Sequence, residues 1–219
     1  KPLEKAKKAG IEVVLVDTTV NKPKKVAVSE ISSNNYAGGA AALRAIKNAG
    51  VSGGKVMGIG VRPGISTTDA RDAGFKDAVA KDSNFEFIGQ EYSQNEPAIA
   101  AQITSAAIAA NPDLKAIFAS NLFSAQGAAT GIKQAGKEGE IIVIGFDAGP
   151  DQIKALKDGT VQALIAQKPY NIGTQGVAQA LRALNGKKTK SKITTGFTII
   201  TPKNVNTNFG QKAAYRSKC

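Results

Sequence analysis

Short apolar runs alternate with longer amphipathic segments along the chain, and this alternation constrains the fold more than any other feature of the sequence. The runs are rich in Val, Ile, Leu and Phe, which is typical of strands that are buried on both faces of a parallel sheet. They predict strands at residues 13–16, 55–61, 85–88, 114–119, 141–146 and 161–166. The amphipathic segments predict helices at residues 36–48, 67–80, 97–110, 124–135, 150–156 and 170–184.

The order strand–helix–strand, with connections of a few residues, predicts right-handed βαβ units. Residues 55–166 contain five of the predicted strands with helices between them, which is enough for one complete doubly wound domain. The predicted elements outside residues 55–166 are too few for a second complete domain. We therefore expect an α/β fold with one complete parallel sheet and a smaller remainder.

The composition excludes several classes of chemistry, because the 219 residues include no histidine and only one cysteine, Cys219. Histidine is the commonest metal ligand and general base, so its absence argues against a zinc site or a Ser-His-Asp triad. A single cysteine forms no internal disulfide, and the fold must rely on its core. We expect no cofactor, no metal and no enzymatic activity.

The start of the sequence shows neither a membrane span nor a basic–apolar leader, so we expect any export signal to have been removed or never included. The formal net charge is +12, which has two interpretations. Nucleic-acid binding is one, but no helix-turn-helix pattern or interleaving of aromatic and basic residues accompanies the lysines. A basic solvated surface is the favoured interpretation, with an anionic ligand or a negatively charged membrane face as alternatives.

Polar side chains follow the ends of the predicted strands, where ligands bind in open parallel sheets. Asp17, Asn121, Asp147 and Gln167 each come directly after a strand, or one residue later. Asp69 and Arg71 follow the loop after the strand at 55–61. Carboxylates accept hydrogen bonds, amides accept and donate, and arginine donates through a planar fork. The combination suits a ligand that carries many hydroxyl groups.

Each of these residues also has a structural interpretation. A polar residue at a strand end is often a helix N-cap or a turn former, and Asp147 could cap the helix that follows it. Arg71 could pair with Asp69 or Asp72 on its own helix. The convergence of all these residues on one sheet edge favours binding.

Two enzymatic interpretations of the sequence have weaker support than ligand binding. Gly58-Ile59-Gly60 resembles part of a dinucleotide loop, but it lies within a strand and Pro63 occupies the position expected for the third glycine. Asp17 and Asp147 could form the carboxylate pair of a glycosidase, although the strand pattern argues against it.

Several stretches resemble one known family, and the match extends over nearly the whole chain. The stretches are residues 9–17, 34–38, 71–75, 117–121, 144–148 and 155–170. They are similar to the ribose- and galactose-type periplasmic sugar-binding proteins of ABC transporters, which share their fold with the cores of lactose-repressor-type regulators. The stretch 155–170 favours the transporter receptors over the regulators.

The resemblance implies a periplasmic-binding-protein type I fold with two lobes that close around the ligand, each lobe a doubly wound parallel sheet. The N-terminal lobe would be incomplete and contain residues 1–33 and 169–197, and the C-terminal lobe would contain residues 34–168 and 198–219. Asp17, Asn121, Asp147 and Gln167 would bind the hydroxyls of a sugar or polyol. The implied partner is a transporter permease or a chemosensor, and the implied location is the periplasm or a lipid anchor outside the cell.

Because of three departures from the ribose type, the resemblance does not identify which sugar is bound. Thr18 replaces the arginine that follows the aspartate in that type, and Asp69 replaces a ligand-contacting arginine. The chain has no tryptophan, so Phe123 is the candidate for stacking on a sugar, with packing as its alternative role. The alternative functions are the effector-binding core of a lactose-repressor-type regulator and a folded fragment without ligand. A dimer or a complementing N-terminal fragment would complete the first lobe.

Overall fold

The computed structural model describes residues 1–216, and Cys219 lies outside them. The chain folds as two compact units, and each unit takes segments from distant parts of the sequence. Unit 1 contains Lys1–Asn34 and Lys168–Phe197, and unit 2 contains Asn35–Gln167 and Thr198–Cys219. The chain therefore passes three times between the units.

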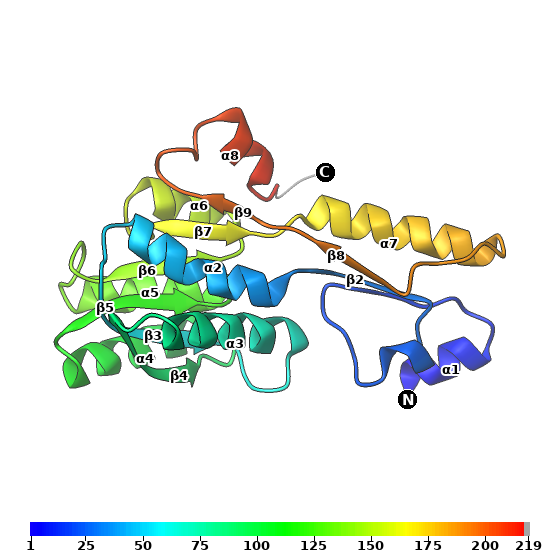
Figure 1. Ribbon diagram of the computed structural model, residues 1–219, viewed down its shortest axis with the longest axis horizontal. Coiled ribbons are helices and arrows are strands. Elements are labelled where there is room, and N and C mark those ends of the chain that lie inside the picture. Colours follow the sequence, from blue (N-terminus) through cyan, green and yellow to red (C-terminus); the bar gives the residue numbers. More distant parts are fainter. Residues whose placement is uncertain (217–219) are drawn as a thin grey trace. The chain divides into compact units, whose positions relative to one another are not determined.

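Unit 2 is built on a six-stranded sheet with the order β4-β3-β5-β6-β7-β9. Its strands are β3 (Gly54–Gly60), β4 (Phe85–Tyr92), β5 (Leu114–Ala119), β6 (Ile142–Phe146), β7 (Ala163–Ala166) and β9 (Thr198–Ile200). All neighbours run parallel except β9, which pairs antiparallel with β7 at one edge of the sheet (Figure 1). The structure confirms the predicted parallel α/β sheet, and the strand order changes direction between β3 and β5.

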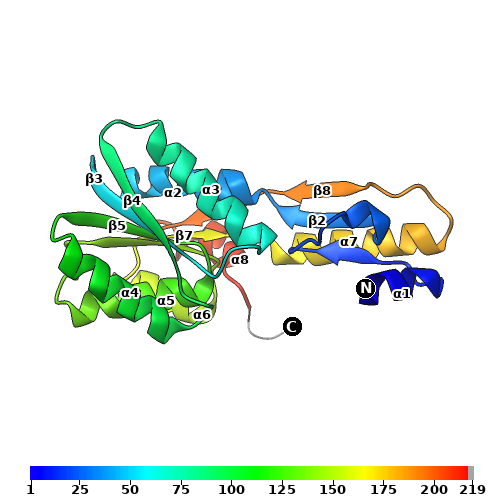
Figure 2. The same cartoon turned by 90° about the horizontal axis from the view of Figure 1, so that it is seen from below.

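Helices cover both faces of this sheet, as Figure 2 shows for α2 and α3 on one face and α4 and α5 on the other. The helices of unit 2 are α2 (Asn35–Asn48), α3 (Ser66–Ala80), α4 (Pro97–Ala110), α5 (Leu122–Gln134), α6 (Pro150–Lys157) and α8 (Asn208–Ala213). The helix predicted at 124–135 begins earlier, because Asn121 caps it.

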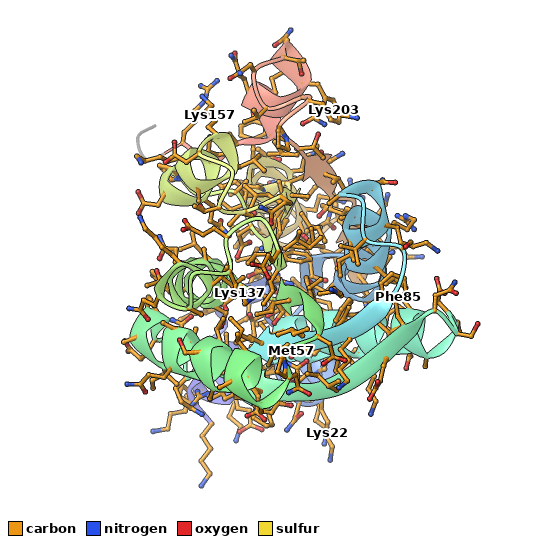
Figure 3. The ribbon with its side chains drawn as sticks, turned by 90° about the vertical axis from the view of Figure 1, so that its left-hand side faces the viewer. Lys22, Met57, Phe85, Lys137, Lys157 and Lys203 are labelled. Carbon is orange, nitrogen blue, oxygen red and sulfur yellow. The ribbon has the colours of Figure 1, made fainter. Side chains whose placement is uncertain are left out.

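The two faces of the sheet have separate apolar cores because successive residues of a strand point to opposite sides. On one side, Met57 and Ile59 of β3 belong to a cluster with residues of α4 and α5. On the other side, the ring of Phe75 from α3 packs against Phe87 and Phe118, with centroids 5.9 and 5.0 Å away. Figure 3 shows Met57 among packed side chains, whereas the exposed Lys157 and Lys203 lie at the periphery of unit 2.

Glycines allow the helices on each face to pack with their backbones in contact. A methyl group on Gly39 of α2 would overlap the carbonyl oxygen of Arg71, and one on Gly74 of α3 would overlap that of Tyr36. Gly127 of α5 similarly lies against the backbone of α4. Because these contacts are with main-chain atoms, no side-chain rotation can relieve the overlap.

We expect Gly39→Ala and Gly74→Ala each to lower the free energy of unfolding by about 1–3 kcal/mol, because the added methyl forces the two helices apart. Urea unfolding monitored by circular dichroism measures the change. Gly173→Ala is the matched control, since Gly173 lies in a helix and no atom lies within 4 Å of its added methyl. That control should gain up to about 1 kcal/mol from helix propensity. Equal effects at Gly39 and Gly173 would contradict the close-packing argument.

Unit 1 has a smaller sheet of three parallel strands in the order β1-β2-β8. Its elements are α1 (Pro2–Lys8), β1 (Val14–Val16), the 3-10 turn η1 (Pro23–Lys25), β2 (Ser29–Ser33), α7 (Pro169–Leu184) and β8 (Lys192–Thr195). Helix α7 packs on this sheet, where Gly176 leaves room for the side chain of Val16. Among the described residues, no helix is both long and apolar enough to cross a membrane.

Helix α7 also carries an exposed apolar stripe, defined by Tyr170, Val177, Leu181 and Leu184. These side chains are 80%, 63%, 55% and 69% exposed, respectively, and their spacing places them on one face of the helix. Isolated exposed apolar residues are common, but an aligned set of four is typical of a surface that another chain or segment covers.

Candidate functional site

The strongest candidate site lies where β6 and β7 of unit 2 end. Asp147 follows β6 directly, and Gln167 follows β7. The Nε2 of Gln167 donates a hydrogen bond of 2.8 Å to Oδ1 of Asp147. The two residues that the strand pattern placed at one sheet edge are therefore in contact.

Asp147 has an unusual backbone conformation, with φ at +75° in the left-handed region. Its amide donates to the carbonyl oxygen of Ile165 on β7, at 3.0 Å. This bond continues the ladder one residue beyond β6, and the left-handed turn then redirects the chain into the loop before α6. Non-glycine residues in this region cost about 1 kcal/mol, and such strain is often found at functional positions.

Tyr215 completes the network, although the sequence analysis did not single it out. Its hydroxyl donates to Oδ1 of Asp147 at 3.0 Å and accepts from the amide of Gln167 at 2.9 Å. Its own amide bonds to the carbonyl of Ala148, which anchors the segment after α8. Burial, followed by the negative charge of Asp147, raises the pKa of Tyr215, so the phenol stays protonated and remains a donor.

Asp147 is consequently held from two sides by donors to a single oxygen. Within residues 1–216, no side chain or amide donates to its Oδ2, so this oxygen can accept a hydrogen bond from a ligand. The sequence offered no local signal for Tyr215, because it lies 68 residues from Asp147 in a short segment near the C-terminus.

Arg71 of α3 is nearly fully buried, with 3% of its surface exposed. Its Nε donates to Oδ1 of Asn35 at 2.8 Å, and its Nη1 donates to the carbonyl of Ser120 at 2.9 Å. The guanidinium lies over the ring of Phe146, 3.7 Å from its centroid. A desolvated cation–π contact of this kind contributes about 2 kcal/mol. Arg71 therefore joins the carboxyl ends of β5 and β6.

Asn121 acts as the N-cap of α5, because its Oδ1 accepts from the amide of Ser124 at 3.3 Å. Its Nδ2 donates to Oδ1 of Asn95 at 2.7 Å. The capping role that was an alternative in the sequence analysis is thus present. Its role in ligand binding stays a prediction.

The two remaining candidates are Asp69 in unit 2 and Asp17 in unit 1. Asp69 accepts from the amide of Gly64 and lines a cavity between α3 and β4, which none of the other five candidates lines. Asp17 belongs to unit 1, where it follows β1. It repeats the conformation of Asp147, with φ at +64° and an amide bonded at 2.7 Å to Ile31 on the neighbouring strand β2.

Phe123, the candidate for stacking on a sugar, lies in the first turn of α5 and is 41% exposed. The arrangement as a whole offers carboxylate, amide and phenol groups around one strand edge, with a fixed guanidinium beside them. Within residues 1–216, no group of three His, Cys, Asp or Glu side chains is placed to hold a metal ion. These carboxylate, amide and phenol groups can form hydrogen bonds with a polar molecule.

Comparisons with known proteins give a consistent family. Residues 1–188 match the periplasmic binding protein domain. The ribose import binding protein of Escherichia coli K12 is 34% identical over 187 residues, which are 85% of this chain and 62% of that protein. The chain belongs to the periplasmic binding protein domain family and spans less than two thirds of this relative's length.

Solved structures agree with this assignment. An ABC transporter solute-binding protein from Agrobacterium vitis, bound with α-D-tagatopyranose, is 38% identical with a TM-score of 0.93. The match covers 98% of this chain and 75% of that one. Another from the same species, with bound D-fucose, is 34% identical with a TM-score of 0.89 and covers 97% of this chain and 74% of that one.

We expect Tyr215→Phe to lower the free energy of unfolding by about 1–2 kcal/mol, because it removes the hydroxyl that accepts from the partly buried amide of Gln167 and donates to Asp147. Urea unfolding gives the difference. Tyr170→Phe is the control, since Tyr170 is 80% exposed and its variant should match the parent protein. A Tyr215→Phe variant as stable as this control would show that the network contributes little to the fold.

Proposed function

We propose that the chain is the ligand-binding component of an ABC importer and that it binds a small polyhydroxylated molecule, a sugar or polyol, without changing it chemically. The observation that carries the proposal is the network of Asp147, Gln167 and Tyr215 at the strand edge of unit 2. The relatives described above are import binding proteins and sugar-bound solute-binding proteins rather than regulators, which supports transport over gene regulation.

The network supports sugar binding because its groups are held in place before the ligand arrives. Oδ2 of Asp147 accepts a hydrogen bond from a hydroxyl group of the ligand, while Oδ1 stays bonded to Gln167 and Tyr215. A charge-assisted hydrogen bond in a desolvated site contributes about 1.5–3 kcal/mol, so a few such bonds give a useful affinity. The fixed positions of Gln167 and Tyr215 reduce the entropy that is lost on binding.

The importer assignment also proposes a permease as the partner and the periplasm, or an extracellular lipid anchor, as the location. Membership of the family and the relatives' role in import support both proposals.

The test is a thermal-shift screen of the purified chain against pentoses, hexoses, polyols and their phosphates. A ligand at 100 times its dissociation constant adds about 2.7 kcal/mol to the free energy of unfolding, which shifts the melting temperature measurably. The phosphates test whether the basic surface selects an anionic ligand. If no member of the panel raises the melting temperature, the proposal for this chain fails.

Asp147→Ala should weaken binding of any ligand found in the screen by about tenfold to a hundredfold, since it removes a charged acceptor. Isothermal titration calorimetry measures the loss. Asp151→Ala is the matched control, because Asp151 lies in the first turn of α6 and is exposed. Unchanged affinity in Asp147→Ala would exclude this network as the site. Asp17→Asn, Asp69→Asn and Asn121→Ala test the other candidates in the same assay.

We also propose that the exposed apolar stripe of α7 is covered by further polypeptide, either a second copy of the chain or a complementing N-terminal fragment. The support is the exposure of its four side chains beside the small sheet of unit 1. Sedimentation velocity over a range of concentrations distinguishes the two: self-association that Leu181→Lys abolishes indicates a second copy. A chain that remains monomeric argues against the second copy and leaves the fragment, whose binding the same variant should weaken.

A further inference from the structure

A cavity of unit 2 lies between α3 and β4, and no residue of the Asp147 network lines it. Its volume is about 360 Å³, within the range of small-molecule sites. Its lining combines acidic, amide, aromatic and small apolar side chains: Pro63, Asp69, Asp72, Ala73, Lys76, Phe87, Gln90 and Tyr92.

The glycines of β3 create the space in which its polar groups sit. A methyl group on Gly58 would overlap Oε1 of Gln90, and one on Gly60 would lie 2.5 Å from Oδ2 of Asp72. Gln90 from β4 and Asp72 from α3 therefore meet over a strip of bare backbone. Any larger residue at Gly58 or Gly60 would displace them.

Two buried oxygens beside this strip have no hydrogen-bond partner among residues 1–216. They are Oδ1 of Asp72 and Oε1 of Gln90, and both residues line the cavity. Asp72 is only 8% exposed. Such groups are rare in folded proteins and call for a specific explanation, because each loses its bonds to water on folding. Both oxygens can accept a hydrogen bond.

Two aspartates, Asp69 and Asp72, make the lining of the cavity acidic. The pKa of Asp72 is raised to about 7, and burial is the largest cause. A hydrogen bond from Ser120 and the charge of Arg71 lower this pKa, whereas the charge of Asp69 raises it. The pKa of Tyr92 is also raised, first by burial and then by Asp72, Asp69 and Glu91. Lys76 is exposed and contributes one positive charge, so the lining carries one net negative charge when both aspartates are ionised.

We propose that this cavity binds a small organic cation, a primary ammonium group on a short apolar body. An ammonium has three donors and no acceptor, which suits the unpartnered oxygens of Asp72 and Gln90. The walls formed by Phe87 and Tyr92 suit the short apolar body. The volume exceeds what a bare metal ion needs.

The experiment compares three chloride salts at equal ionic strength and pH 8: n-propylammonium, tetramethylammonium and potassium. The readouts are the melting temperature and calorimetric titration. n-Propylammonium should raise the melting temperature, whereas tetramethylammonium, which has no N–H donor, and potassium should not. An equal shift with potassium would overturn the proposal in favour of an inorganic cation. No specific shift with n-propylammonium would also overturn it.

Asp72→Asn should weaken n-propylammonium binding about tenfold, because it removes the charge that the ammonium meets. Glu86→Gln is the matched control, as it makes the same change at an exposed position of β4 outside the cavity. If Asp72→Asn binds n-propylammonium as tightly as the parent protein does, this cavity is excluded as the binding site. The sugar screen is an independent readout, since Asp72→Asn should keep sugar binding and Asp147→Ala should keep amine binding.

The pH dependence gives a second readout. The pKa of Asp72 is about 7 in the folded protein and near 4 in the unfolded chain, so the folded state retains a proton that the unfolded state has released. This group therefore lowers stability as the pH rises from 4 to 7, and Asp72→Asn should lack that decline. Binding of n-propylammonium should weaken as the pH falls through 7 and Asp72 takes up its proton. Binding that is independent of pH between 6 and 8 would contradict the assignment.

Discussion

The buried guanidinium of Arg71 is the contact on which the strand edge of unit 2 depends. It extends from α3 to the start of α2 at Asn35, to the end of β5 at Ser120 and to the ring of Phe146 at the end of β6. A buried charge is tolerated only when it is well bonded, so these partners must hold their positions for the fold to be stable. Asn121 and Asp147 immediately follow two of these anchor points. The geometry of the proposed site is therefore set by a residue whose described contacts are structural.

The fold could be predicted where burial dictates the pattern. Strands such as β5 and β6 are buried throughout or nearly so, and their apolar runs are unambiguous in sequence. Strand β2, with the sequence SEISS, and strand β8, with KITT, each hold one isoleucine and were not predicted. Their strand conformation comes from pairing with each other and, for β2, with β1, not from a local pattern. The C-terminal helix α8 was missed as well, because it has only six residues.

The candidate site also contains residues that could be predicted from the sequence and residues that could not. Asp147 and Gln167 could be brought together from the sequence because parallel strands end at a common edge. Tyr215 could not, since its contacts depend on how the segment after α8 folds back over 48 and 68 residues. Asp69 lines the cavity of Asp72 and Gln90, because the first turn of α3 also borders β4, and its role in ligand binding stays a prediction. Sequence position identifies which strand end a residue follows, but not which side of a helix its carboxylate occupies.

The left-handed aspartates have a consequence for how such a protein can change. Asp17 and Asp147 both adopt a backbone conformation that glycine would adopt without strain. At Asp147 a glycine would relax the main chain and at the same time delete the oxygen that accepts hydrogen bonds from Gln167 and Tyr215. The relief of about 1 kcal/mol of backbone strain would be offset by two lost hydrogen bonds, each of which contributes about 1 kcal/mol. The network therefore holds the strained conformation in place, and replacing this aspartate by glycine would not make the fold more stable.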